Sequence, residues 1–77
     1  MIELVLAVAL SCMLSDTPAR VTAWLLSQDM QPAATAYSKR FRREIAVWRD
    51  SAGRYKIVVP YGVNLCVLDA GVNWQWH

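Results

Sequence analysis

The spacing of apolar side chains changes near Glu44, and this change constrains the fold more than any other feature of the chain. Before Glu44, residues 2–15 are apolar on all sides, as in a buried helix, and apolar residues recur at helical spacing in residues 18–28 and 32–44. After it they alternate with polar residues in residues 45–49, 54–59 and 72–76, and a short apolar run at 65–68 favours one more strand. The sequence therefore predicts an α+β fold, with three N-terminal helices followed by a small antiparallel β-hairpin or sheet.

Capping and turn residues support these boundaries. Asp16 or Thr17 can cap the second predicted helix, and Pro18 suits its first turn, where the missing N–H of proline costs nothing. Pro32 marks the start of the third predicted helix in the same way. Residues 50–53 end in Gly53, which is typical of a hairpin turn between two strands.

The length of the chain predicts one domain, because 77 residues have room for one core and no linker or low-complexity segment interrupts them. Residues of the apolar and aromatic types make up 56% of the chain, and four of them are tryptophans. A core this small cannot enclose so much apolar surface. We therefore expect a single domain, residues 1–77, that forms a homodimer or binds a partner protein through its C-terminal strand.

The apolar segment at residues 2–14 resembles a signal peptide in composition, but Glu3 puts a negative charge where a signal peptide is positive. The segment is also shorter than the roughly 20 residues needed to cross a bilayer. It is interpreted as a buried core helix, so we expect no membrane association.

The two cysteines, Cys12 and Cys66, match no metal-binding or redox spacing. Both lie in apolar runs, where a free cysteine usually behaves as a small buried side chain. They are interpreted as two buried thiols of a cytoplasmic protein, with a disulfide or a reactive thiol as the alternative.

Residues suited to catalysis are scarce. No two carboxylates lie close together near an apolar site, and the sequence contains no glycine-rich phosphate loop. The single histidine, His77, is the last residue, which leaves Cys66 and His77 as the one pair that could form a nucleophile. We expect a protein that is not an enzyme and that holds no metal or cofactor.

The positive charge is concentrated in the middle of the chain. The formal net charge is only +2, but five of the eight basic residues lie between Lys39 and Arg49, and Arg54 and Lys56 follow closely. Cations grouped in this way can follow a line of phosphates.

Residues 21–59 resemble the winged helix–turn–helix domains that are common in phage and plasmid regulators. The resemblance implies that the third predicted helix reads the major groove of duplex DNA and that residues 50–53 form the wing. It implies a DNA-binding regulator from a phage or another mobile element. The residues it assigns to DNA contact are Gln31, Thr35, Ser38, Lys39, Arg40, Arg42, Arg43, Arg54 and Lys56.

The alternative is a small inhibitor or adaptor that binds a host protein. Trp74 and Trp76 share one face of the last predicted strand, and tryptophan is a frequent anchor of protein interfaces. In size and aromatic content the chain also resembles phage inhibitors of host defence such as anti-CRISPR proteins. The position of the cations separates the two hypotheses: convergence on one surface favours DNA, and separation favours protein.

Overall fold

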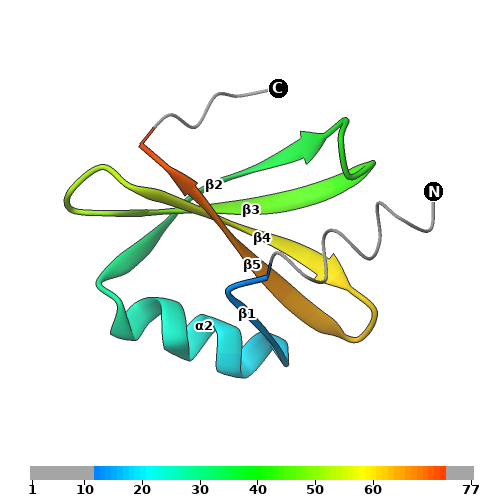
Figure 1. The fold of residues 1–77 in the computed structure, drawn as a ribbon, viewed down its shortest axis with the longest axis horizontal. Coiled ribbons are helices and arrows are strands. Elements are labelled where there is room, and N and C mark those ends of the chain that lie inside the picture. Colours follow the sequence, from blue (N-terminus) through cyan, green and yellow to red (C-terminus); the bar gives the residue numbers. More distant parts are fainter. Residues whose placement is uncertain (1–11, 73–77) are drawn as a thin grey trace.

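The computed structural model of the chain describes residues 12–72, which form one helix and one β-sheet (Figure 1). The elements, in chain order, are β1 Leu14–Asp16, α2 Pro18–Ser27, β2 Met30–Ser38, β3 Arg43–Asp50, β4 Tyr55–Tyr61 and β5 Asn64–Gly71.

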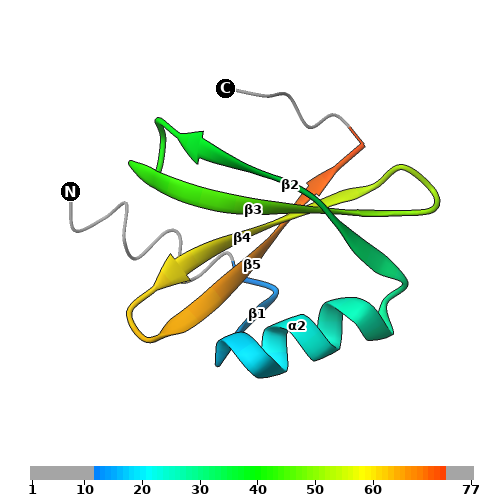
Figure 2. The ribbon, with the colours of Figure 1, turned by 180° about the vertical axis from the view of Figure 1, so that it is seen from behind.

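The five strands form a single antiparallel sheet in the order β1-β5-β4-β3-β2. Three hairpins connect β2 to β5, and β1 then pairs with β5, so that the first and last described strands are neighbours. Helix α2 lies along one side of this sheet, as Figure 1 and the reverse view in Figure 2 both show. The strands at the two edges of the sheet are β1 and β2.

The predicted second helix is confirmed as α2. The Thr17 side chain accepts a hydrogen bond from the backbone N–H of Arg20 at 3.4 Å, and Pro18 occupies the first turn. Val21 and Leu25, one turn apart, are buried against the sheet. The helix ends at Ser27, and Asp29, whose φ of 58° lies in the left-handed region, then redirects the chain into β2.

The predicted fold of three helices followed by a hairpin is wrong, because the sheet begins before α2 and residues 32–44 are not a helix. They form most of β2, a four-residue turn at residues 39–42, and the start of β3. Strand β2 pairs with β3 along its length, from Met30 opposite Asp50 to Ser38 opposite Arg43. The described residues are therefore mostly β-structure.

The error has a physical cause. Pro32 and the helical spacing of apolar residues favoured a helix here, but a local preference of this kind is weak, and tertiary pairing overrides it. A helix over these residues would turn small side chains such as Ala33 toward the core, and their burial would contribute little apolar area. As a strand, the same segment bonds its backbone to β3, and Met30, only 2% exposed, enters the core.

The first predicted helix and the last predicted strand fall mainly outside the described residues. Residues 2–11 belong to the former and residues 73–76, including Trp74 and Trp76, to the latter. Leu14 and Ser15, at the end of the first predicted helix, belong to β1 instead. Val72, at the start of the last predicted strand, lies in a turn after β5.

The predicted hairpin at residues 50–53 is confirmed. The backbone N–H of Gly53 donates to the carbonyl of Asp50 at 3.2 Å, and Gly53 adopts a φ of 83° that favours glycine. The strands on either side of it are longer than the apolar alternation indicated, since β3 begins at Arg43 and β4 continues through Pro60 to Tyr61.

Alternation along the strands gives the sheet two apolar faces. On the helix side, Val58 and Val67 pack with α2 and with Trp48, which is 8% exposed. On the opposite face a second cluster contains Ile45, Val47, Ile57 and Val59. The sheet therefore buries side chains on both faces, which accounts for much of the apolar content of the sequence.

A disulfide joins Cys12 to Cys66, with their Cα atoms 5.4 Å apart. It links the residues just before β1 to the middle of β5, across 54 positions of sequence. The interpretation of the cysteines as two separate buried thiols is therefore wrong, and the alternative of a disulfide is confirmed. The fully buried position of Cys66 agrees with its apolar run, but the sequence did not indicate that Cys12 lies beside it.

Candidate functional site

Strand β2 is the long edge of the sheet, and most of its side chains are exposed. Only Met30, at its first position, is buried, and the next five residues are all exposed. No residue of β2 carries a charge. An uncharged edge strand of nine residues is unusual, because edge strands generally carry charges that discourage pairing with other chains.

The hairpins determine which backbone groups of β2 face outward. The backbone N–H of Asp50 donates to the carbonyl of Arg54 at 3.0 Å, so even-numbered residues of β3 bond toward β4 and odd-numbered ones toward β2. The β2 residues opposite Val47 and Ile45 are Ala34 and Ala36, which are bonded inward. The alternation therefore turns the N–H and carbonyl groups of Thr35 and Tyr37 toward the open edge.

The other half of this edge is protected. The register between β2 and β3 shifts between Pro32 and Ala34, where Ala33 is the extra residue of a bulge. A bulge twists the strand, and proline offers no N–H to a neighbouring chain. Pairing with another strand is therefore limited to the half of β2 around Thr35 and Tyr37.

Tyr37 is the largest exposed side chain beside these open backbone groups, at 58% exposure. This residue was predicted to lie within a helix over residues 32–44, and this was wrong because Tyr37 lies on strand β2. The signal that could have identified the strand is the alternation of Thr35 and Tyr37 with alanines directly after Pro32.

Residues 39–42, which we call the basic turn, carry three of the predicted DNA-contacting cations. The turn is closed by the backbone N–H of Arg42, which donates to the carbonyl of Ser38 at 2.7 Å. The Ser38 side chain also accepts from the N–H of Phe41 at 3.3 Å, so this hydroxyl holds the turn rather than projecting from a helix. The Arg40 guanidinium lies over the Phe41 ring, 5.4 Å from its centroid.

Arg43 differs from the three cations of the basic turn. Its guanidinium Nη1 donates to the carbonyl of Pro60 at 2.6 Å, which directs the side chain across to β4. Lys39, Arg40 and Arg42 are all exposed, and no ion pair neutralises them within residues 12–72.

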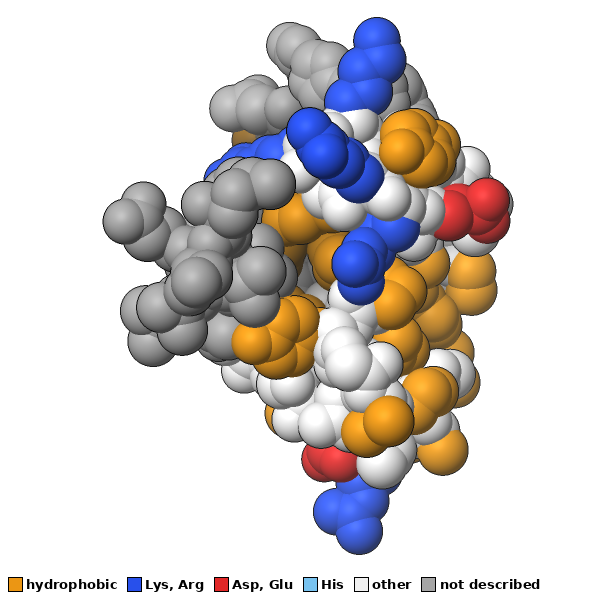
Figure 3. Space-filling view, turned by 90° about the vertical axis from the view of Figure 1, so that its right-hand side faces the viewer, with side chains coloured by type: hydrophobic (Ala, Val, Ile, Leu, Met, Phe, Trp, Pro, Cys, Tyr) orange, Lys and Arg blue, Asp and Glu red, His pale blue; other side chains and the backbone are white. Residues whose placement is uncertain are grey.

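The predicted DNA-contacting residues do not lie on one helix. Gln31, Thr35 and Ser38 are on β2, whereas Lys39, Arg40 and Arg42 lie in the turn before β3 and Arg43 is the first residue of β3. Figure 3 shows several Lys and Arg side chains near the top of one face of the molecule. Arg54 and Lys56 lie beside the other end of β3, about 17 Å to 23 Å from Arg43 along the strand at roughly 3.3 Å per residue. The cations therefore form two groups, the outcome that favours protein over DNA.

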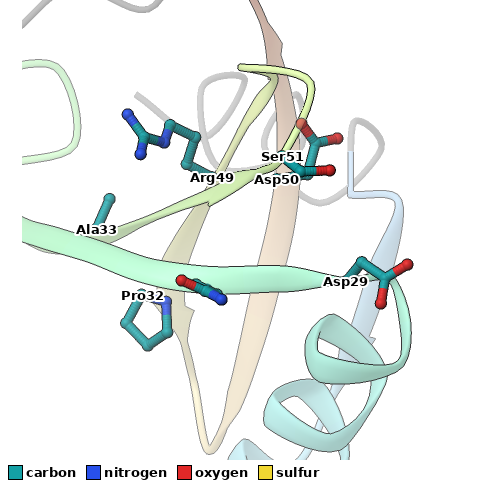
Figure 4. Close-up of a pocket in the computed structure, with 7 residues that line it drawn as sticks. Asp29, Pro32, Ala33, Arg49, Asp50 and Ser51 are labelled. Atoms are coloured by element: carbon teal, nitrogen blue, oxygen red, sulfur yellow. The ribbon is translucent and has the colours of Figure 1, made fainter.

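A shallow pocket of about 200 Å³ opens where β2 begins and β3 ends. Its polar lining includes Asp29, Gln31, Arg49 and Asp50. Figure 4 shows the Arg49 and Asp50 side chains pointing in different directions, with Asp29 apart from both. These groups do not converge on a common point, so the pocket lacks the geometry of an acid–base pair.

The pKa of the Asp50 carboxyl is lowered. The largest cause is the hydrogen bond that the carboxylate accepts from the backbone N–H of Arg54, at 2.9 Å. Desolvation, the second-largest cause, raises the pKa, but a second hydrogen bond from the N–H of Ala52 and the positive charges of Arg54 and Lys56 add to the lowering. Asp50 therefore stabilises the β3–β4 turn in its ionised form.

We predict that this turn makes the stability of the protein depend on pH in the acid range. Because the folded pKa lies below the ordinary value of 3.8, the stabilisation is complete above that value and is lost as the pH falls through the folded pKa. Urea midpoints between pH 2 and pH 6 should fall less steeply for Asp50→Asn than for the parent. Asp29→Asn is the control, since the Asp29 carboxylate makes no hydrogen bond within residues 12–72. Equal slopes for Asp50→Asn and the parent would contradict the prediction.

Within residues 12–72 no group of three His, Cys, Asp or Glu side chains is placed to hold a metal ion. Nor does any helix there have the length and apolar character needed to cross a bilayer. Comparison with models of protein families, with curated proteins and with solved structures finds no match to this chain.

Proposed function

We propose that the chain is a non-catalytic binding module that adds an extended segment of a partner protein to its sheet at β2. One observation carries the proposal: the backbone groups of Thr35 and Tyr37 face an open edge within a long uncharged strand. Strand addition of this kind obtains affinity from main-chain hydrogen bonds and specificity from neighbouring side chains. The exposed ring of Tyr37 supplies such a side chain.

The fold favours protein binding over the DNA-binding hypothesis. A winged-helix regulator needs a recognition helix, and residues 32–44, which were assigned to that role, form most of β2, the basic turn and the start of β3. Two of the predicted DNA-contacting cations, Arg54 and Lys56, lie at the other end of β3 from the basic turn. The basic turn is the group of cations that lies beside the exposed part of β2.

The disulfide supports an oxidising compartment as the place of action. Disulfides persist in secreted and periplasmic proteins and are rare in the cytosol, where thiols are kept reduced. The cytoplasmic expectation depended on two separate thiols, and Cys12 and Cys66 are paired. We therefore include an oxidising compartment in the proposal, together with a partner protein from the same compartment.

Thr35→Pro is the substitution that tests pairing at β2. The Thr35 N–H faces the open edge, so proline there removes a donor to the partner without removing a hydrogen bond to β3. Ala36→Pro is the matched opposite, because the Ala36 N–H faces β3 and its loss should weaken the fold itself. We predict that Thr35→Pro stays folded and no longer binds the partner.

The measurement is capture of partners from nuclease-treated extract of the source cells, followed by amide exchange on the purified complex. Partner binding should slow exchange at Thr35 and Tyr37, and Thr35→Pro should capture less than a tenth of the same partner. Undiminished capture by folded Thr35→Pro would exclude β2 as the binding edge. If the parent captures the partner from untreated extract but not from nuclease-treated extract, a nucleic acid links the two proteins and β2 does not bind the partner directly.

A further inference from the structure

We infer that the segment which pairs with β2 carries acidic residues that lie beside the basic turn. This inference depends on the proposed function, since β2 must first receive an extended segment. Strand β2 continues directly into Lys39 and Arg40, so a segment paired at Thr35 and Tyr37 passes the basic turn within the next few residues. The main chain of the partner would thus be held at the edge and its carboxylates at the turn.

The charges around this end of β2 favour an acidic segment. Lys39, Arg40 and Arg42 are exposed, and the nearest acid along the chain is the single residue Glu44, opposite Tyr37. Arg40 is partly held in place by the Phe41 ring, which reduces the freedom it would lose on binding. The structure therefore presents three cations against one carboxylate, beside the part of the edge that is open.

A second copy of the chain fits this charge pattern poorly. If Thr35 of one copy paired with Tyr37 of the other, antiparallel register would put Lys39 opposite Ala33 of the second copy. Residues 30–38 contain no carboxylate to pair with the basic turn. An acidic segment from a different protein can accept and donate the hydrogen bonds of Thr35 and Tyr37, and its carboxylates can also neutralise the positive charges of the basic turn.

We assign to the added segment the antiparallel direction that the strand pairs of the sheet share. Every strand pair of the sheet is antiparallel, and an antiparallel neighbour of β2 runs from the basic turn toward Pro32. Its acidic residues therefore precede the residues that pair with Tyr37 and Thr35. The inferred recognition sequence is an acidic run followed by a short alternating β-forming stretch.

The probe is a fluorescein-labelled synthetic peptide, Glu-Glu-Glu-Thr-Val-Thr-Val-Thr, with a second peptide in which glutamine replaces each glutamate. Binding is measured by fluorescence anisotropy with the full chain in its disulfide form. The variants are the triple change Lys39→Gln/Arg40→Gln/Arg42→Gln, the single change Arg43→Gln, and Thr35→Pro. Arg43→Gln is the matched control, because that guanidinium is bonded to Pro60 on the other side of β3.

We expect the parent to bind the glutamate peptide about fivefold to tenfold more tightly than the glutamine peptide, at a few tenths of a kcal/mol for each exposed charge pair. The triple change should remove this difference and leave binding of the glutamine peptide unchanged. Arg43→Gln should preserve most of the difference, and Thr35→Pro should abolish binding of both peptides.

The possible failures are distinguishable. If both peptides bind the parent equally and Thr35→Pro abolishes both, the acidic partner is excluded while edge pairing stands. If the glutamate peptide binds Thr35→Pro as well as the parent, edge pairing fails and the basic turn acts alone. If neither peptide binds the parent at millimolar concentration, the inference is overturned. It is also overturned if a single-stranded oligothymidylate binds the parent more tightly than the glutamate peptide does and binds Thr35→Pro as tightly as the parent.

Discussion

Reduction of the disulfide between Cys12 and Cys66 should lower the free energy of unfolding by about 4 kcal/mol, the loop-closure value for a cross-link that spans 54 positions. The effect is large because a domain of this size has a total stability of only about 5–15 kcal/mol. The position of the disulfide adds to the effect, because the bond joins the residues before β1 to the buried middle of β5.

Urea unfolding with and without a phosphine reductant measures this effect. The parent should unfold at a clearly lower urea concentration once reduced, and Cys12→Ser should unfold near the reduced parent under both conditions. Cys12→Ser is the better single change, because Cys12 is half-buried whereas Cys66 is fully buried. A parent that unfolds at the same midpoint after its thiols are shown to be free would contradict the prediction.

Replacement of Leu25 by alanine should destabilise the fold by about 2–5 kcal/mol. Leu25 is fully buried where α2 meets the sheet, in the cluster that includes Val58 and Val67. The substitution would leave a cavity beneath the only helix of the described residues, and in a domain of marginal stability it should leave much of the population unfolded.

The neighbouring residue provides the control. Leu26 is 56% exposed, so Leu26→Ala removes the same atoms from the same helix without creating a cavity and should cost about 0.5 kcal/mol or less. Thermal melts followed by circular dichroism compare the two variants directly. Equal costs would show that α2 is not seated on the sheet through Leu25.

The sequence predicted the segments whose signals are local. Thr17 and Pro18 mark the start of α2, and Gly53 marks the β3–β4 turn, because a cap or a left-handed glycine acts within a few residues. The strands at residues 45–49 and 54–59 were predicted from alternation. The structure extends the first at both ends, to Arg43–Asp50, and the second only at its C-terminal end, as Tyr55–Tyr61.

The sequence did not predict what depends on distant partners. Residues 32–44 satisfy a helical spacing, and only pairing with β3 makes the first part of them a strand. Cys12 and Cys66 come together because β1 joins β5, a pairing that no local pattern shows. The candidate site shares this difficulty, since the open edge at Thr35 and Tyr37 exists only once the strand order is known.

The pairing of β1 with β5 also sets an order of folding. The three hairpins close loops of two to four residues, whereas the union of β1 with β5 must bring together segments about fifty residues apart, at a greater loss of chain entropy. During synthesis the hairpins can therefore form as each strand emerges, whereas β1 can pair only after β5 has been made. Until β5 has formed, Cys12 cannot make its native disulfide with Cys66. The native disulfide therefore forms last, and an oxidant that acts earlier would join Cys12 to a thiol of another molecule.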